Sequence, residues 1–277
     1  MRQDIQYAER DGVAVITISR PQVMNALSPV TVREIAEAVI EFDEAEHLSV
    51  CVITGAGDAS FCAGADLKWA DSHPDEWETA QQNIERAHSS WFRRTHTVLG
   101  GDLPAEVWKP LIAAVNGYCL GGGLEMAMQC DLVVASETAT FGFPEVVRGW
   151  VPGAGGVFFA TRNLPLKAAM EMLLTGEPIS AHRAYELGLV NRVVPPERLM
   201  DEALGLAARI SANSPLAVQC AKELAMKGLD VPLNYPPHAW QVMESSDMLR
   251  KVRAASEEKR RAFAGRESKR GPGATDR

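Results

Sequence analysis

Several motifs that would assign a common chemistry are missing from this sequence. The five cysteines are scattered and form neither a CxxC pair nor a cluster with histidine, which argues against a metal site or a disulfide framework and indicates free thiols in a reducing compartment. No GxGxxG or GxSxG stretch occurs, so a dinucleotide-binding fingerprint and a nucleophile elbow are both absent. The first ten residues, MRQDIQYAER, lack the apolar core of a secretory signal. We therefore expect a soluble cytoplasmic protein without a bound metal.

Positive charge is in short supply. The 36 acidic residues exceed the 28 lysines and arginines, and the formal net charge is −8 at pH 7. Such a balance argues against general nucleic-acid binding. The only apolar stretch of membrane length, residues 111–130, contains Asn116, Glu125 and Gln129, so we expect a buried strand and helix there and no membrane partner. Residues 249–270 contain nine lysines and arginines against three glutamates. The favoured interpretation of this stretch is a solvated helix followed by a frayed tail.

Short apolar runs alternate with helical patterns along the chain, which predicts an α/β fold. Ser28 followed by Pro29 predicts the start of a helix, and the polar stretch 72–78 around Pro74 predicts a loop before a helix at 79–99. The predicted buried strands are residues 13–19, 50–54, 111–115, 131–135 and 190–194, the first of them preceded by a hairpin partner at 5–7.

Three consecutive glycines, Gly121 to Gly123, stand where the buried run from Leu111 gives way to a helical pattern. Glycines at a helix start are costly in backbone entropy and suit a backbone that something approaches closely, or free N–H groups that face a ligand. Glu125 follows within an apolar setting, where a carboxylate is expensive unless paired or used. The functional interpretation is an oxyanion-binding turn beside an acid or base, and the alternative is tight helix packing around a satisfied glutamate.

Two further features have the same double interpretation. The small residues from Cys62 to Ala65 suit a backbone that passes close to a ligand, or a plain strand-to-helix turn capped by Asp66. Glu145 follows Pro144 and opens a short helix, where it is either a surface residue or a member of the site. Together Glu125 and Glu145, each at a helix start in a glycine-rich setting, outline an acid/base couple.

These motifs, in this order, resemble the crotonase family, also called the enoyl-CoA hydratase/isomerase superfamily. The resemblance implies an α/β spiral of ββα units (residues 1–198) followed by a C-terminal helical region (residues 199–277) that forms a homotrimer or a dimer of trimers, with a disordered end. It is carried by FCAGADL at 61–67, KPLIAAVNGYCLGGGLE at 109–125, CDLVVAS at 130–136, FGFPEVVRGWVPGAGG at 141–156 and ELGLVNRVVP at 186–195.

The resemblance also implies a site. The matching positions give the backbone N–H groups of Ala65 and Gly122 to the thioester oxygen, and make Glu125 the base that activates water and Glu145 the acid that protonates the α-carbon. No separate cofactor is expected, because coenzyme A is part of the acyl-CoA substrate. The residues implied for coenzyme A or substrate binding are Ala63, Ala65, Asp66, Leu67, Lys68 and Gly122, with Phe263 and Arg266 from a neighbouring subunit.

Because both carboxylates are present, the predicted activity is the reversible hydration of 2-enoyl-CoA thioesters to 3-hydroxyacyl-CoA. Two alternatives stay open. One is a related reaction at the same site, such as a carnitinyl-CoA-type dehydration or an isomerisation of the double bond. The other is a catalytically idle acyl-CoA-binding subunit.

Overall fold

The computed structural model describes residues 2–79, 107–229, 243–244 and 246–257. The chain divides into two compact units, Met1–Ala212 and Asn213–Arg277, and each is described by itself. The predicted helix at 79–99, apart from residue 79, and the predicted contacts of Phe263 and Arg266 lie outside the described residues.

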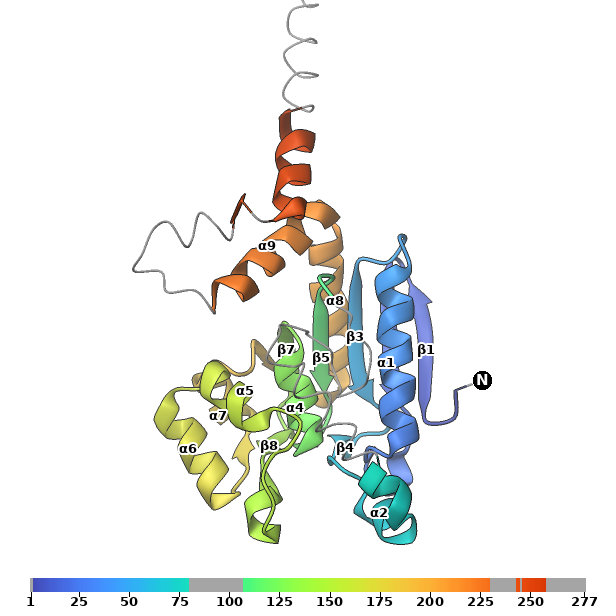
Figure 1. The fold of residues 1–277 in the computed structure, drawn as a ribbon, viewed down its shortest axis with the longest axis vertical. Coiled ribbons are helices and arrows are strands. Elements are labelled where there is room, and N and C mark those ends of the chain that lie inside the picture. The colour runs from blue at the N-terminus through green and yellow to red at the C-terminus, as the bar shows by residue number, and fades with distance from the viewer. Residues whose placement is uncertain (1, 80–106, 230–242, 245, 258–277) are drawn as a thin grey trace, which may run out of the picture. The chain divides into compact units, whose positions relative to one another are not determined.

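A six-stranded sheet forms the centre of the first unit (Figure 1). Its order is β1 (Ile5–Arg10), β2 (Val13–Ile18), β3 (Val50–Gly55), β5 (Leu111–Val115), β7 (Leu132–Ser136) and β10 (Arg192–Val194). The β1–β2 pair is antiparallel and every other pair is parallel. Asp11 and Gly12 both have positive φ, which suits the two-residue turn of a right-twisted hairpin. Five predicted strands and the hairpin are thereby confirmed.

Both faces of this sheet are buried, which explains why its central strands are apolar at successive positions. The helix α8 (Leu199–Ser211) covers one face and packs Leu199, Ala203 and Leu206 onto side chains such as Val52 and Ile112. The other face meets the helix α1 (Pro29–Glu44), which buries Ile35, Val39 and Phe42. Ser28 caps α1 through a reciprocal pair of hydrogen bonds with Thr31, so the predicted helix start is also confirmed.

A second, four-stranded sheet has the order β4 (Ser60–Cys62), β6 (Tyr118–Leu120), β8 (Thr140–Gly142) and β9 (Ile179–Ser180). Each of the first three follows a strand of the large sheet and leads into a helix: β3–β4–α2 (Leu67–Ser72), β5–β6–α4 (Gly122–Gln129) and β7–β8–η2 (Pro144–Arg148). The β4, β6 and β8 strands are parallel neighbours. Consequently the turns that leave them lie side by side at one edge of the small sheet.

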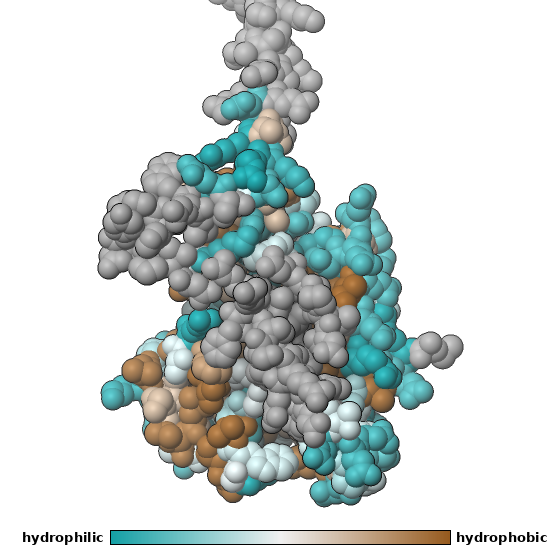
Figure 2. All heavy atoms as spheres, viewed as in Figure 1, coloured by the Kyte–Doolittle hydropathy of each residue, from teal (hydrophilic) through white to brown (hydrophobic). Residues whose placement is uncertain are grey.

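Further helices among the described residues of the first unit are η1 (Pro21–Val23), α5 (Gly156–Asn163), α6 (Leu166–Thr175), α7 (Ala181–Glu186) and η3 (Pro196–Arg198). Figure 2 shows apolar side chains gathered on the surface over α5 and α6, where Val147, Val151, Phe158, Leu166 and Leu174 are exposed. In the second unit, α9 (Pro215–Gly228) buries Glu223, whose carboxylate accepts a hydrogen bond from Ser246 at 2.5 Å and pairs with Lys227.

The loop predicted at 72–78 is wrong. Ser72 ends α2, and residues 74–79 are helical. Proline is tolerated in the first turn of a helix, because its missing N–H would have no intrahelical partner there, so Pro74 starts a helix instead of interrupting one. None of the helices within the described residues is long and apolar enough to cross a membrane.

Candidate active site

The first turn of the site connects β4 to α2 and is held by one short bridge. Leu27 pairs with Ala65: the Leu27 N–H donates to the Gly64 carbonyl at 2.8 Å, and the Asp66 N–H donates to the Leu27 carbonyl at 2.9 Å. In such a bridge the N–H of the central residue points away from the partner strand. The Ala65 N–H is therefore directed away from Leu27, and Ala65 is exposed.

The second turn connects β6 to α4 and packs directly against the first. A Cβ atom on Gly64, which has φ +87°, would lie 2.9 Å from the Leu120 carbonyl oxygen and 3.1 Å from the Gly122 nitrogen. A Cβ on Gly123 would lie 2.3 Å from the Cys62 carbonyl oxygen. These distances leave no room for a side chain at Gly64 or Gly123. The close backbone approach that was predicted for both glycine-rich turns is therefore the approach of the two turns to each other. Gly122 opens α4, where the first N–H groups have no intrahelical acceptor.

Glu125 lies in the first turn of α4 and is 3% exposed. Its Oε1 accepts a hydrogen bond from the Gly156 N–H at 2.7 Å, at the start of α5. Burial raises the pKa of Glu125 to about 7; the charge of Glu145 adds to this rise, while the N–H groups of Gly156 and Ala154 oppose it. A carboxyl group in this range can exchange a proton near neutral pH.

Glu145 is the second residue of η2 and is half-buried. Its Oε2 is buried and has no hydrogen-bond partner within residues 2–79, 107–229, 243–244 and 246–257. Burial raises the pKa of Glu145 as well, and the nearby Arg148 works in the opposite direction. A buried carboxylate oxygen without a donor costs stability, and such an atom is therefore a candidate for contact with a ligand or water.

The two carboxyl groups face the same pair of glycines. A Cβ on Gly121 would lie 2.7 Å from Glu145 Oε1, and a Cβ on Gly122 would lie 3.8 Å from Glu125 Oε2. Gly121 and Gly122 are consecutive, so both side chains reach one turn. Burial is the main cause of the raised pKa of Glu125, and the charge of Glu145 adds to it.

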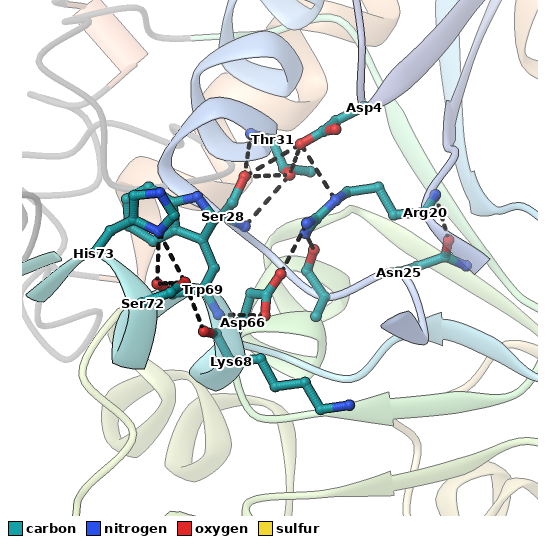
Figure 3. Close-up of polar contacts among 11 residues, drawn as sticks. Asp4, Arg20, Asn25, Ser28, Thr31, Asp66, Lys68, Trp69, Ser72 and His73 are labelled. Atoms are coloured by element: carbon teal, nitrogen blue, oxygen red, sulfur yellow. Dashed lines mark hydrogen bonds and ion pairs between the residues drawn. The ribbon is translucent and has the colours of Figure 1, made fainter. Parts of the chain in front are cut away.

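Among the residues predicted to bind coenzyme A, the Asp66 side chain is fully used by protein contacts. Its Oδ1 caps α2 by accepting the Trp69 N–H at 3.0 Å, and its Oδ2 accepts from Arg20 Nη2 at 2.8 Å. The prediction that Asp66 caps the helix after the strand-to-helix turn is therefore confirmed. Figure 3 shows that the Lys68 side chain extends away from these contacts. Ala63 and Leu67 are half-buried and Lys68 is exposed.

Two partners of the site were not found from the sequence. Gly156, which holds Glu125, is 31 residues away from it, and Arg20, which holds Asp66, is 46 residues away. The available signal for Arg20 was a charged residue directly after a buried strand. Such a residue is more often a solvated strand end, so the signal was weak.

A family model described as "Enoyl-CoA hydratase/isomerase" matches residues 8–266. The chain belongs to this family. Its sequence is 38% identical over 258 residues to (E)-benzylidenesuccinyl-CoA hydratase from Thauera aromatica, an alignment that covers 91% of this chain and 96% of the relative.

Solved structures of the enoyl-CoA hydratase/isomerase family superpose along most of the chain. An enoyl-CoA hydratase from Mycobacterium marinum has a TM-score of 0.79 and 35% identity, with 96% of each chain covered. A carnitinyl-CoA hydratase from Mycobacterium avium has a TM-score of 0.70 and 38% identity, with 94% of this chain and 97% of that chain covered. The predicted crotonase-like α/β fold is confirmed by these neighbours and by the repeated ββα units.

Proposed function

We propose that this protein catalyses the reversible hydration of 2-enoyl-CoA thioesters to 3-hydroxyacyl-CoA. The observation that carries the proposal is the convergence of Glu125 and Glu145 on the Gly121–Gly122 turn. The addition of water to an enoyl thioester needs a base at the β-carbon and an acid at the α-carbon, both next to a group that stabilises an enolate. The activities in the names of the relatives support the same reaction class.

The proposed oxyanion hole consists of the N–H groups of Ala65 and Gly122. Addition at the β-carbon places negative charge on the thioester oxygen, and preorganised donors stabilise that charge most when they are fixed before the reaction. The bridge to Leu27 leaves the Ala65 N–H outside the strand pairing, and the Gly122 N–H belongs to the first turn of α4, so both donors are available to a ligand. Removal of one such donor raises the barrier by about 3–4 kcal/mol in comparable sites.

In hydration, ionised Glu125 takes a proton from a water molecule while the water oxygen attacks the β-carbon. Protonated Glu145 gives its proton to the α-carbon. The reaction ends with the proton on Glu125 and with Glu145 ionised, which is the starting state for dehydration. A reversible enzyme therefore needs a singly protonated pair in which either partner can hold the proton. Two carboxyl groups with raised pKa values that repel one another suit this requirement.

The same site could begin from the hydroxyacyl side. A carnitinyl-CoA hydratase and a benzylidenesuccinyl-CoA hydratase are among the similar proteins, so a branched or aromatic acyl group is the second candidate substrate. This alternative keeps the same pair of glutamates but exchanges their roles, because in dehydration Glu145 takes the α-proton and Glu125 protonates the departing hydroxyl group. An isomerase would move the proton between two carbons, and an idle acyl-CoA-binding subunit would move none.

We further propose a homotrimer or a dimer of trimers in the cytoplasm, with Phe263 and Arg266 touching the nucleotide of a neighbouring subunit. The exposed apolar side chains over α5 and α6 are of the kind that self-association buries. Light scattering coupled to size-exclusion chromatography tests the assembly, and a monomer at micromolar concentration would contradict it.

The decisive experiment follows the loss of conjugated enoyl-thioester absorbance with a panel of 2-enoyl-CoA substrates. Glu145→Gln should lower kcat by a factor of roughly 10²–10⁴, because positioned acid–base groups contribute factors of this size. Glu34→Gln is the matched control, since Glu34 is also a buried glutamate and its two carboxylate oxygens accept the N–H groups of Gln3 and Asp4.

Equal rates for wild type and Glu145→Gln would contradict the proposed role of Glu145. An idle subunit would show no rate at all in the wild type. A hydroxyacyl-CoA panel assayed in the reverse direction separates the dehydratase alternative from the hydratase.

A further inference from the structure

Arg20 stands just past the end of β2, and its side chain is only 13% exposed. Nη2 donates to Asp66 Oδ2 at 2.8 Å, Nη1 donates to the Ala26 carbonyl, and Nε lies 3.4 Å from Asp4 Oδ2. Figure 3 shows the guanidinium between Asp4 and Asp66, with Asn25 at the backbone of Arg20. One side chain thus joins the N-terminal segment, the 20–28 loop and the start of α2.

The two strongest contacts of Arg20 lie on either side of the Leu27–Ala65 bridge. Ala26 immediately precedes Leu27, and Asp66 immediately follows Ala65. Arg20 therefore holds one segment just before the bridge and the other segment just after it. A backbone contact adds to this connection, because the Ala63 N–H donates to the Met24 carbonyl at 3.1 Å. Ala65 lies between Ala63 and Asp66, which both take part in these contacts.

We propose that Arg20 is a positioning residue that fixes the direction of the Ala65 N–H toward the thioester oxygen. The inference rests on the proposed function, because it assumes that Ala65 is an oxyanion donor. Arg20 itself need not touch the substrate: it acts through Asp66 and through the Ala26 carbonyl. A displacement of about 1 Å at such a donor can lower a rate by a factor of about 10².

The chemistry of the guanidinium group explains why arginine is needed here. Its planar fork presents several N–H donors in fixed directions and can hold the Asp66 carboxylate and the Ala26 carbonyl at the same time. A lysine ammonium keeps the charge but is a compact group on a flexible stem. Arg20→Lys should therefore keep the ion pair with Asp66 or the contact with Ala26 but lose the fixed geometry between them.

A purely structural ion pair makes a different prediction. Its loss would lower the melting temperature and leave the chemistry of a bound thioester unchanged. The carbonyl stretching frequency of bound crotonyl-CoA, labelled with ¹³C at the thioester carbon, separates the two roles, because hydrogen bonds to the oxygen weaken the C=O bond. Infrared difference spectra are recorded in a Glu145→Gln background so that the thioester is not consumed.

We expect Arg20→Lys to lower kcat by roughly 10- to 100-fold, to change KM by less than about threefold, and to reduce the downshift of the carbonyl band. Asp66→Asn should act in the same direction, since asparagine still caps α2 but cannot form the ion pair. Arg192→Lys is the matched control: Arg192 pairs with Glu202 on the first unit, is partly buried, and should leave kcat and the carbonyl band unchanged.

Arg20→Lys and Asp66→Asn variants with wild-type kcat and a wild-type carbonyl band would overturn the role of Arg20, even if both melted earlier. A wild type that shifts the carbonyl band of bound crotonyl-CoA without hydrating any enoyl-CoA would remove the proposed function instead, and the spectra of the variants would still decide the role of Arg20. A wild type that leaves the band unshifted would overturn both.

Discussion

Buried acidic side chains occur in two regions of the first unit, and the two regions treat them differently. Near the N-terminus, Glu34 accepts the N–H groups of Gln3 and Asp4 at 2.7 and 2.8 Å, one on each oxygen, and Asp66 has the Trp69 N–H on one oxygen and Arg20 on the other. Around the small sheet, Glu125 Oε1 accepts the Gly156 N–H at 2.7 Å, and Glu145 Oε2 has no hydrogen-bond partner among the residues that the structure describes.

This difference in hydrogen bonding distinguishes carboxylates that stabilise the fold from those available to a ligand. A carboxylate whose oxygens are both satisfied stabilises the fold and has nothing left to offer a ligand. A carboxylate that is buried and incompletely satisfied destabilises the fold, and its retention needs another explanation, which the proposed chemistry supplies. The contrast can be tested by removing charges in each region and comparing the signs of the effects.

The largest expected effect is on the rate, from the Glu125→Gln/Glu145→Gln double variant. Each single variant should lose a factor of roughly 10²–10⁴ in kcat. If the pair transfers protons as a unit, the double variant should lose little more than the worse single variant, because residues that act together are not additive. Hydration kinetics of the three variants measure this, and multiplicative losses would show that the two carboxyl groups act independently.

The next effect comes from Gly121→Ala, which adds a methyl group 2.7 Å from Glu145 Oε1 and places alanine at φ +53°. We expect a loss of about 10² in kcat, because a displaced carboxyl group no longer meets the substrate in the same geometry. Gly188→Ala is the control for backbone strain alone, since Gly188 has φ +84° and no atom within 4 Å of the added Cβ.

Both glycine variants should lose about 1–2 kcal/mol of stability. Only Gly121→Ala should lose activity, and equal losses of activity in the two would attribute the effect to strain and not to Glu145. Thermal melts and initial rates on the same preparations provide the comparison.

The last predicted effect is on stability, and it has opposite signs in the two regions: removing the charge of Glu125 should stabilise the fold, whereas removing that of Glu34 should destabilise it. The folded-state pKa of Glu125 is raised from 4.5 to about 7, so the folded protein binds this proton more tightly than the unfolded chain does. Stability is therefore lost as pH rises from about 4.5 to about 7, and the full penalty, on the order of 2–3 kcal/mol, is present above that range. Glu125→Gln should raise the free energy of unfolding at pH 8 and have little effect near pH 5.

Glu34→Gln should instead destabilise the protein, by about 1–2 kcal/mol, because it replaces one of two satisfied carboxylate acceptors with an amide donor. Urea unfolding at pH 5 and pH 8 measures both variants. A Glu125→Gln variant that is less stable than the wild type at pH 8 would refute the predicted cost of the buried Glu125 charge.

Local sequence patterns were enough to predict the large sheet and the turns that hold Glu125 and Glu145. The runs at 50–54 and 111–115 are almost entirely apolar because both faces of those strands are buried, and Gly121–Gly123 and Pro144–Glu145 indicated the two turns. The error at 72–78 came from treating Pro74 as a helix breaker when it begins a helix. Strands of three residues, such as β4, β6 and β8, are too short for periodicity to detect.

Short-range patterns of burial, glycine and proline in the amino-acid sequence determined the α/β class and singled out the two glutamates, while the ββα units were implied by the resemblance to the crotonase family. Only the tertiary structure decided that β4, β6 and β8 are neighbours, that the Gly156 N–H holds Glu125, and that Arg20 reaches both Ala26 and Asp66. The last three contacts join residues that are between 6 and 46 positions apart. Whether a carboxylate oxygen is satisfied depends on what the folded chain brings to it, and no local pattern contains that information.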